Sequence, residues 1–172
     1  MIILETDRLI LRHIISQDID SLLKIYNKAE NMRFISNGKS NWTVEELNKK
    51  YELINRNYKL GFGIYAIEQK ETNSIIGEIG LFDSFNDNSN LEIGYIIDSL
   101  FWNKGFGKEA CVGLLDYAFN KLKVETLTAR MYAENINSIE LSKKCGMSKI
   151  KEGLTDNGAK FLVFEIKRIK YP

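Results

Sequence analysis

The sequence has little of several residue types that mark particular classes of protein. Its 172 residues include one histidine, His13, and one proline, Pro172, which is the last residue. A lone histidine removes most zinc sites and Ser-His-Asp triads, so we expect no metal. Because no repeat, low-complexity run or proline-rich linker interrupts the chain, we expect residues 1–172 to form a single domain.

Cysteine, net charge and long apolar runs are also scarce. Two cysteines without a CxxC spacing, Cys111 and Cys145, indicate buried thiols in a reducing cytoplasm and no disulfide framework. A formal charge of +1, from 24 basic and 23 acidic residues, argues against a nucleic-acid partner. No apolar run approaches the roughly 20 residues that cross a bilayer. Glu5, Asp7 and Arg8 stand where a signal peptide would be apolar, so we expect no membrane association or export.

The apolar residues recur first with a helical period and later with a strand period. The segment Thr43-Val-Glu-Glu46 is a capping box that starts a helix. We expect helices at 19–29, 43–57, 107–122 and 137–144, and strands at 9–11, 62–68, 75–82, 91–97, 126–132, 148–152 and 160–168. Turns are expected at 69–74, 83–90 and 156–158, with Gly146 as a left-handed helix cap. This order predicts an α/β fold, a mixed sheet with one right-handed crossover through the helix at 107–122. Gly94 inside a strand indicates a bulge or the close approach of another group.

The most informative segment is Trp102-Asn-Lys-Gly-Phe-Gly-Lys-Glu109, between a strand and a helix. The first amides of a helix lack internal partners and lie at its positive end, and glycines let a phosphate approach them. Lys104 and Lys108 add positive charge, so the segment predicts an anion-binding loop. The alternative is a glycine-containing loop that only leads into a core helix.

Two nucleotide motifs resemble this loop but do not fit its context. Gly105, Gly107 and Ala110 match a dinucleotide fingerprint, with Glu125 twenty residues after the first glycine. In that motif the first glycine leaves a strand directly, whereas residues 98–104 intervene here. A phosphate-binding P-loop is excluded because that motif requires serine or threonine after its Gly-Lys pair, whereas Glu109 follows Gly107 and Lys108 here.

Asn135, Ser138 and Ser142 form a polar stripe on the helix at 137–144. A polar stripe often faces solvent, but this one follows a strand, as the glycine loop does. Ligands of open α/β sheets bind at the carboxyl ends of strands, so one molecule can contact both segments.

Five segments follow one another along the chain: Glu5-Thr-Asp-Arg-Leu-Ile-Leu-Arg12, Ile93-Gly-Tyr95, residues 102–110, Asn135-Ile-Asn-Ser138 and Lys144-Cys-Gly-Met147. Together they resemble the GNAT superfamily of acyl-CoA N-acetyltransferases, and most closely its RimJ/RimL-type branch of ribosomal-protein N-terminal acetyltransferases. The resemblance covers nearly the whole chain and implies a GNAT-like fold with splayed central strands. It implies that acetyl-CoA is the donor, that its pantetheine arm lies beside Ile96 and Ile97, and that Asn135 and Ser138 contact this arm. It also implies that Gly94 marks the bulge that splays the sheet. The residues implied to bind the pyrophosphate are Asn103, Lys104, Gly105, Phe106, Gly107 and Lys108.

The catalytic residues are predicted from both position and resemblance. Ser142 stands where many superfamily members have a tyrosine and where the branch has serine, so we predict that it protonates the leaving thiolate; the alternative is a helix-surface serine. Alternation puts Glu92 on one strand face with Gly94 and Ile96, which makes it our candidate general base, with Glu134 as runner-up. A surface salt bridge explains Glu92 equally well. Backbone amides near Ile96 are expected to polarise the thioester carbonyl.

The acceptor is predicted less sharply than the donor. We expect a primary amine, foremost a peptide N-terminus, with a polyamine or an aminoglycoside as alternatives. A non-catalytic acyl-CoA or nucleotide sensor and a nicotinamide-dependent enzyme are the competing classes, and a homodimer is possible. The acidic residues that would line an acceptor groove, or equally form a solvated face, are Glu30, Glu45, Glu46 and Glu52.

Overall fold

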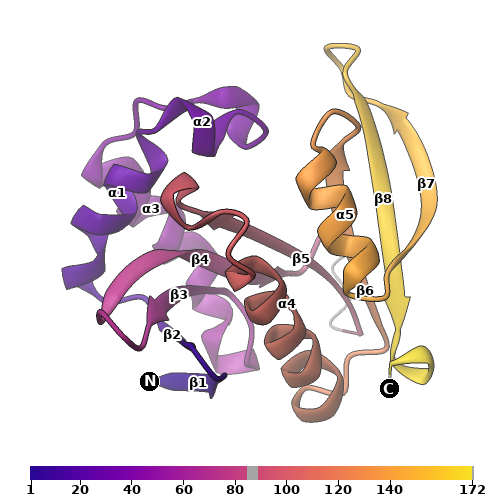
Figure 1. The fold of residues 1–172 in the computed structure, drawn as a ribbon, viewed down its shortest axis with the longest axis horizontal. Coiled ribbons are helices and arrows are strands. Elements are labelled where there is room, and N and C mark those ends of the chain that lie inside the picture. The colour runs from indigo at the N-terminus through magenta and orange to yellow at the C-terminus, as the bar shows by residue number, and fades with distance from the viewer. Residues whose placement is uncertain (85–88, 172) are drawn as a thin grey trace.

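The computed structural model describes residues 1–84 and 89–171, and within them the strands form one mixed sheet (Figure 1). The strands are β1 (Ile2–Glu5), β2 (Leu9–His13), β3 (Ile64–Gln69), β4 (Ser74–Phe82), β5 (Asn90–Ile97), β6 (Thr126–Tyr132), β7 (Ser148–Leu154) and β8 (Lys160–Lys167). Their order across the sheet is β1-β2-β3-β4-β5-β6-β8-β7. The β5–β6 pair is parallel and the other neighbouring pairs are antiparallel, which confirms the predicted mixed sheet.

Within the described residues, five α-helices pack around the sheet. They are α1 (Ile19–Tyr26), α2 (Ala29–Met32), α3 (Val44–Asn55), α4 (Phe106–Asp116) and α5 (Ile136–Lys144). α4 continues through a wider helical turn over Tyr117–Lys121, so the helical segment reaches almost as far as predicted. None of the helices in the described ranges is long and apolar enough to cross a membrane.

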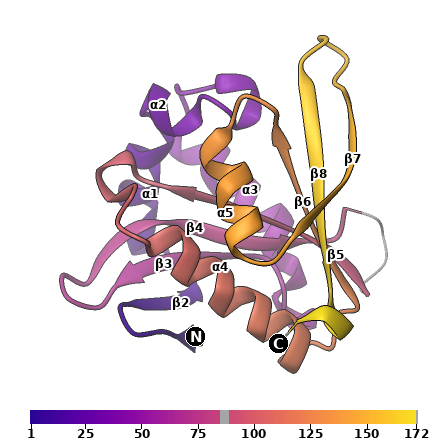
Figure 2. The ribbon, with the colours of Figure 1, turned by 45° about the vertical axis from the view of Figure 1, so that its right-hand side comes forward.

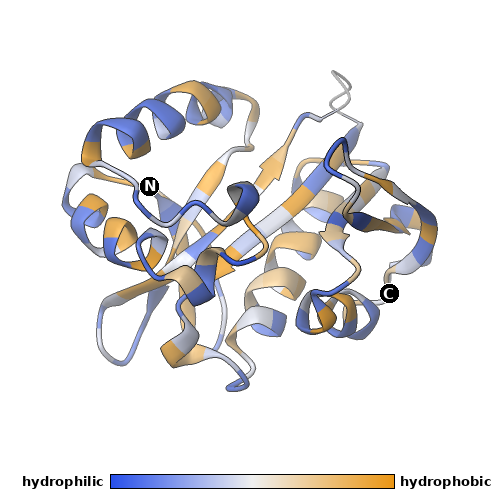
Figure 3. Ribbon diagram, turned by 90° about the horizontal axis from the view of Figure 1, so that it is seen from above, coloured by the Kyte–Doolittle hydropathy of each residue, from blue (hydrophilic) through white to orange (hydrophobic). Residues whose placement is uncertain are grey.

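Two hydrophobic cores lie on opposite faces of the sheet. The larger one joins α4 and the following turn to β2–β6 and β8, and the smaller one joins α1 and α3 to residues such as Ile64 and Ile96. Ile97, the next residue of β5, belongs to the larger core, so the alternation expected along this strand is present. Figure 3 shows hydrophobic residues concentrated on the strands, whereas the helices also carry hydrophilic residues.

Local signals set the boundaries of several elements. Thr43 and Glu46 form the expected capping box, in which the Thr43 side chain accepts from the Glu46 amide at 3.2 Å. Gly146 has φ +83 after α5, as the predicted left-handed cap requires. The sequence analysis missed β1, because its charged Glu5 obscures a short edge strand that pairs with β2. The turn expected over 83–90 lies partly outside the described residues.

The sheet splits in the middle, as the resemblance implied (Figure 2). β5 and β6 pair only from Asn90↔Thr126 to Glu92↔Thr128, whereas β5 stays paired with β4 as far as Ile97. Beyond Glu92 the two parallel strands therefore diverge and leave a gap between them.

The bulge predicted at Gly94 is wrong. Gly94 faces Gly80 in regular register, and a side chain there would meet the Phe82 ring at 3.2 Å, so the close approach is the correct alternative. The register shift nearest to the split lies in β4, where Ile67 faces Gly77 and Glu68 faces Ile75. One extra β4 residue at this point distorts the strand directly beside the end of β5.

Candidate functional site

A cavity of about 670 Å³ lies between the end of β5, α5 and the loop that enters α4. Eight of the ten residues predicted to bind the cofactor line it, and they are Ile96, Ile97, Asn103, Gly105, Gly107, Lys108, Asn135 and Ser138. The cavity is also lined by residues of the α2 side, including Glu30 and Arg33, and by Lys144 of α5. We call it the main cleft.

The glycine loop has the backbone conformation that an anion site needs. Asn103 has φ +57 and Gly105 has φ +85, both in the left-handed region, and Gly105 is the N-cap of α4. The first bond of the helix runs from the Glu109 amide to the Gly105 carbonyl at 3.1 Å. The amides of residues 106–108 therefore precede the helical bonding pattern and are available at the positive end of α4.

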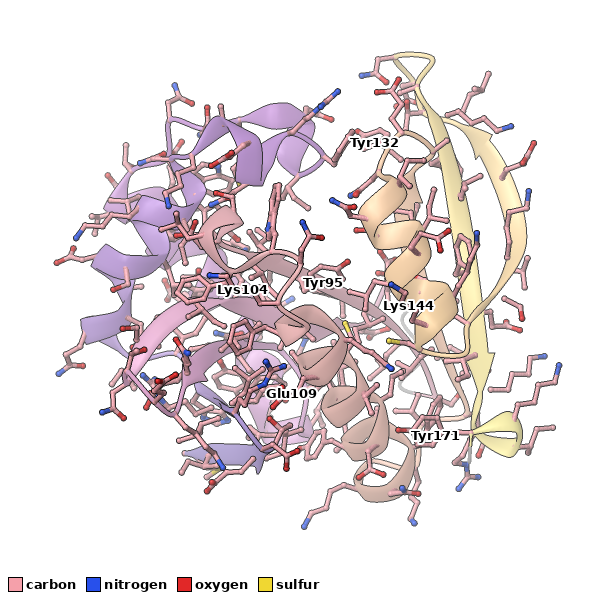
Figure 4. All side chains as sticks on the ribbon, viewed as in Figure 1. Tyr95, Lys104, Glu109, Tyr132, Lys144 and Tyr171 are labelled. Carbon is pink, nitrogen blue, oxygen red and sulfur yellow. The ribbon has the colours of Figure 1, made fainter. Side chains whose placement is uncertain are left out.

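Two predicted cofactor residues do not line the cleft with their side chains. Phe106 is only 5% exposed and packs in the larger core. The Lys104 ammonium lies 5.5 Å from the centre of the Phe101 ring, on the left of the loop in Figure 4. Lys108 and Lys144 are instead the lysines of the cleft wall. Lys144 belongs to one of the segments that carry the family resemblance, but nothing in its sequence context predicted that it lines a binding cleft.

Arg8 holds the glycine loop in place, a role that the sequence analysis did not assign. Its Nε donates to Glu109 at 2.7 Å and its Nη1 to the Lys104 carbonyl at 3.0 Å. Burial alone would raise the pKa of Glu109, but hydrogen bonds from Thr6 and Arg8 outweigh it and lower that pKa. The guanidinium also lies 4.4 Å from the centre of the Phe106 ring. The N-terminal segment thus fixes both ends of the loop.

The main chain of β5 determines which groups face the gap. The Asp98 amide donates to the Ile76 carbonyl of β4 at 2.9 Å. Bonding groups alternate between the two edges of an antiparallel strand, so Ile96 also bonds toward β4, while Tyr95 and Ile97 present theirs to the cleft. The amides near Ile96 that are expected to polarise a substrate carbonyl are therefore those of its neighbours, Tyr95 and Ile97. The Ile97 carbonyl already accepts from the Trp102 indole at 2.7 Å.

A smaller cavity of about 90 Å³ lies at the base of the cleft and contains Ser142 in its wall. Ser142 is only 6% exposed, and its Oγ lies 3.9 Å from the Met131 sulfur, which contradicts the alternative of a solvated helix-surface serine. Tyr95 and Ser138 line both cavities, and their hydroxyl oxygens are 2.9 Å apart. Burial raises the pKa of Tyr95, so its hydroxyl keeps its proton at neutral pH.

Asn135 has a structural contact of its own. Its side chain caps α5 by accepting from the Ser138 amide at 3.2 Å. Cys145 also lines the smaller cavity and is buried, as is Cys111, which confirms the expected burial of both thiols. His13, the single histidine, stacks on Tyr58 at 3.7 Å and lines none of these cavities.

The two candidate bases lie in different places. Glu134, just after β6, lines the main cleft. Glu92 faces Phe82 of β4 and Thr128 of β6 at the last pair before the split, and it is absent from the walls of the cavities formed by the described residues.

A third cavity of about 270 Å³ adjoins the main cleft at its α2 side. Arg33, Phe34 and Glu134 line both. The remaining wall comes from Asn37, from Tyr132 and Ala133 at the end of β6, and from Asn157, Ala159 and Lys160 of the β7–β8 hairpin. The Phe34 and Tyr132 rings lie 6.4 Å apart and span the top of the split, where Figure 4 labels Tyr132.

Of the four acidic residues expected around an acceptor, one lines the main cleft and three do not. Glu30 lines the main cleft and accepts a hydrogen bond from the Ser99 hydroxyl. The three α3 residues, Glu45, Glu46 and Glu52, line none of the three cavities, and Glu46 is ion-paired with Lys39. For α3 the solvated-face alternative therefore holds.

Comparisons with known proteins agree with this geometry. The model of the acetyltransferase (GNAT) domain matches residues 8–148. The chain is 30% identical over 164 residues to the uncharacterized N-acetyltransferase YoaA of Bacillus subtilis (strain 168), covering 92% of each chain.

Two solved structures share the fold at low identity. The spermidine N-acetyltransferase from Vibrio cholerae, in complex with CoA and spermine, has a TM-score of 0.82 at 20% identity, covering 96% of this chain and 99% of that one. RimL, a ribosomal L7/L12 alpha-N-protein acetyltransferase in complex with coenzyme A, has a TM-score of 0.82 at 16% identity, covering 97% and 98%.

Proposed function

Because this chain belongs to the GNAT family of acetyltransferases, we propose that residues 1–172 form one catalytic domain. It moves an acetyl group from acetyl-CoA directly to a primary amine, and the amine is the N-terminus of a peptide. The observation that carries the proposal is the main cleft, which joins the glycine loop at the start of α4 to the gap between β5 and β6.

The cleft offers a separate surface to each part of the donor. The amides of residues 106–108, with Lys108 and Lys144, provide positive potential for a diphosphate. The main-chain groups of Tyr95 and Ile97 that face the gap can bond to the amides of a pantetheine arm, as an added strand would. Both solved neighbours described above are complexes with CoA, which supports acetyl-CoA as the donor.

The reaction needs no covalent enzyme intermediate. The neutral amine attacks the thioester carbonyl carbon and forms a new C–N bond, which gives a tetrahedral intermediate, and the C–S bond breaks when that intermediate collapses. The amine loses a proton, and the departing thiolate gains one or remains ionised, since thiols have pKa values of about 8.5. A main-chain amide of Tyr95 or Ile97 stabilises the negative oxygen of the tetrahedral intermediate.

The proton donor and the base both come from the β6–α5 side of the split. Ser142, buried at the base of the cleft, is the donor for the thiolate. Glu134 is the candidate base that the geometry favours, since it lines both the main cleft and the third cavity. Glu92 stays the alternative base, acting through water from the other face of the sheet.

Kinetics of single variants separate these roles. We expect Ser142→Ala to lower kcat by about a hundredfold with little change in KM, which is the lower end of the typical effect of a general acid. Glu134→Gln is expected to remove the acidic limb of the pH-rate profile, and Glu92→Gln to leave it. An unchanged kcat in Ser142→Ala assigns that serine to packing, and the reverse pattern of the two glutamates reassigns the base.

Free thiol released from acetyl-CoA measures the overall reaction. The acceptor panel contains N-terminal peptides, spermidine and an aminoglycoside, each beside a reaction without acceptor. Thiol release that depends on a peptide supports the proposal. CoA binding in calorimetry without thiol release from any amine would show a sensor, and stabilisation by NAD but not by CoA would show a nicotinamide-binding protein.

A further inference from the structure

The third cavity carries charges that identify the kind of acceptor. We propose that it binds an anionic group of the acceptor, so that the preferred substrate is a peptide with an acidic side chain next to its N-terminal amine. This inference rests on the proposed function and specifies the acceptor for the same site.

The charges are arranged in two groups. Glu134 lies where the third cavity meets the main cleft, so its carboxylate attracts the ammonium of an incoming amine toward the thioester. Arg33 and Lys160 line the third cavity from the α2 side and the β7–β8 hairpin, and Lys160 does not line the main cleft. An acceptor with a positive end and a negative group beside it matches this order of charges.

Arg33 is the stronger anion-binding group of the two cations. It is exposed and has no ion-pair partner within residues 1–84 and 89–171, whereas Lys160 is paired with Glu152 at 2.9 Å. The Arg33 guanidinium lies 5.0 Å from the centre of the Phe34 ring, which restricts its motion over the cavity. A planar guanidinium binds a carboxylate through two parallel hydrogen bonds, which gives both strength and direction.

The segment that carries Arg33 is fixed to the donor site. Lys28, just before α2, pairs with Asp98 at 2.7 Å, and the buried Asn31 accepts from the Ser99 amide at 2.9 Å. Both contacts join α2 to the segment that follows β5 and leads into the glycine loop. The distance between the anion-binding group and the reacting carbonyl is therefore held by the fold.

The same walls disfavour a polyamine. A polyamine needs several carboxylates along its length, and Glu134 is the single acidic residue among the described residues that line the third cavity. Asn37, Asn157 and Tyr132 add uncharged hydrogen-bonding groups, which suit the main chain of a peptide. A volume of about 270 Å³ accommodates one or two residues.

Three peptides that differ only at their second residue test the inference, with glutamate, glutamine or lysine at that position. We expect kcat/KM to fall about tenfold from glutamate to lysine in the parent protein. Arg33→Glu is expected to invert this order, and Arg33→Lys to retain part of it. Arg56→Glu is the matched control, because Arg56 is exposed, lines none of the three cavities and carries the same charge.

Binding of the same peptides to the CoA-loaded protein, measured by calorimetry, separates the two proposals. If no acceptor releases thiol, the proposed function fails. If thiol is released but the three peptides bind and react alike, or Arg33→Glu acts no differently from Arg56→Glu, the inference is overturned while the function stands. Free glutamate as a further acceptor distinguishes a small molecule from a peptide, and its faster turnover would also overturn the inference.

Discussion

Replacing Gly77 of β4 by alanine is expected to distort the proposed donor site, although Gly77 itself does not line the main cleft. A Cβ at Gly77 would lie far inside the contact distance of the Ile96 carbonyl oxygen and 3.0 Å from the Ile97 Cα. Both obstacles are backbone atoms, which cannot rotate away as a side chain can. To restore the roughly 3.3–3.6 Å of carbon–oxygen contacts between strands, the end of β5 must move by about 1 Å.

The expected magnitude follows from this displacement. Overpacking of this kind costs about 1–3 kcal/mol, and the lower entropy of the unfolded alanine chain offsets about 0.4–1 kcal/mol of it. In a chain of this length each kcal/mol lowers the Tm by about 2–4 °C, so a decrease of several degrees is expected. A 1 Å misplacement of catalytic groups reduces rates by about a hundredfold, so kcat is expected to fall more than stability alone would explain.

Gly113→Ala in α4 is the matched control. Its Cβ would meet only the side-chain ends of Leu4 and Thr6, at 3.1 Å, and alanine favours a helix. We expect its Tm to be unchanged or higher and its kcat to be normal. Thermal unfolding and thiol release measured on both variants check the reasoning, and a Gly77→Ala protein with the parent Tm and kcat would refute it.

Two further predictions concern the glycine loop and the single histidine. Arg8→Met keeps the apolar stem but loses the bonds to the loop, and since Arg8 is half exposed we expect the Kd for CoA to rise by only about five- to tenfold in calorimetry. Arg168→Met, which breaks an ion pair with Glu125, is expected to leave that Kd unchanged. Burial lowers the pKa of His13 below 6.5, so the unfolded chain binds more protons and stability is lost as pH falls below about 6.5. The variant His13→Phe keeps an aromatic ring stacked on Tyr58, and we expect its Tm to change less than that of the parent protein between pH 7 and about pH 5. If the Tm of both proteins depends equally on pH, His13 is not the group responsible.

Much of the fold was predictable because its signals are local. Helical and strand periods, the Thr43 capping box and the Gly146 cap depend on neighbouring residues, and these elements were confirmed. The edge strand β1 was missed because short edge strands have weak alternation. The bulge was assigned to Gly94, whereas the nearby register shift lies between Ile75 and Gly77 of β4, because a register shift depends on which strands pair.

The parts of the candidate site that could be predicted are those in which neighbouring residues form a motif within one segment of the chain. The glycine loop and the α5 stripe are contiguous motifs, and most of their residues line the main cleft. Arg8 received no role because its partner Glu109 lies 101 residues away. The third cavity combines parts of three distant segments, so Arg33 and Lys160 gave no common signal.

Under the proposed function, the contact of Arg8 with the first turn of α4 makes coenzyme binding and the outer edge of the sheet interdependent. β1 and β2 form that edge, and local opening of a protein begins at such edges. When these two strands come loose, the loop loses the carboxylate contact that shapes it, so the opened molecule has a weaker hold on its coenzyme. We therefore expect bound coenzyme A to protect the amino-terminal hairpin of this chain, and a high concentration of coenzyme A to slow its degradation by proteases that begin at that end.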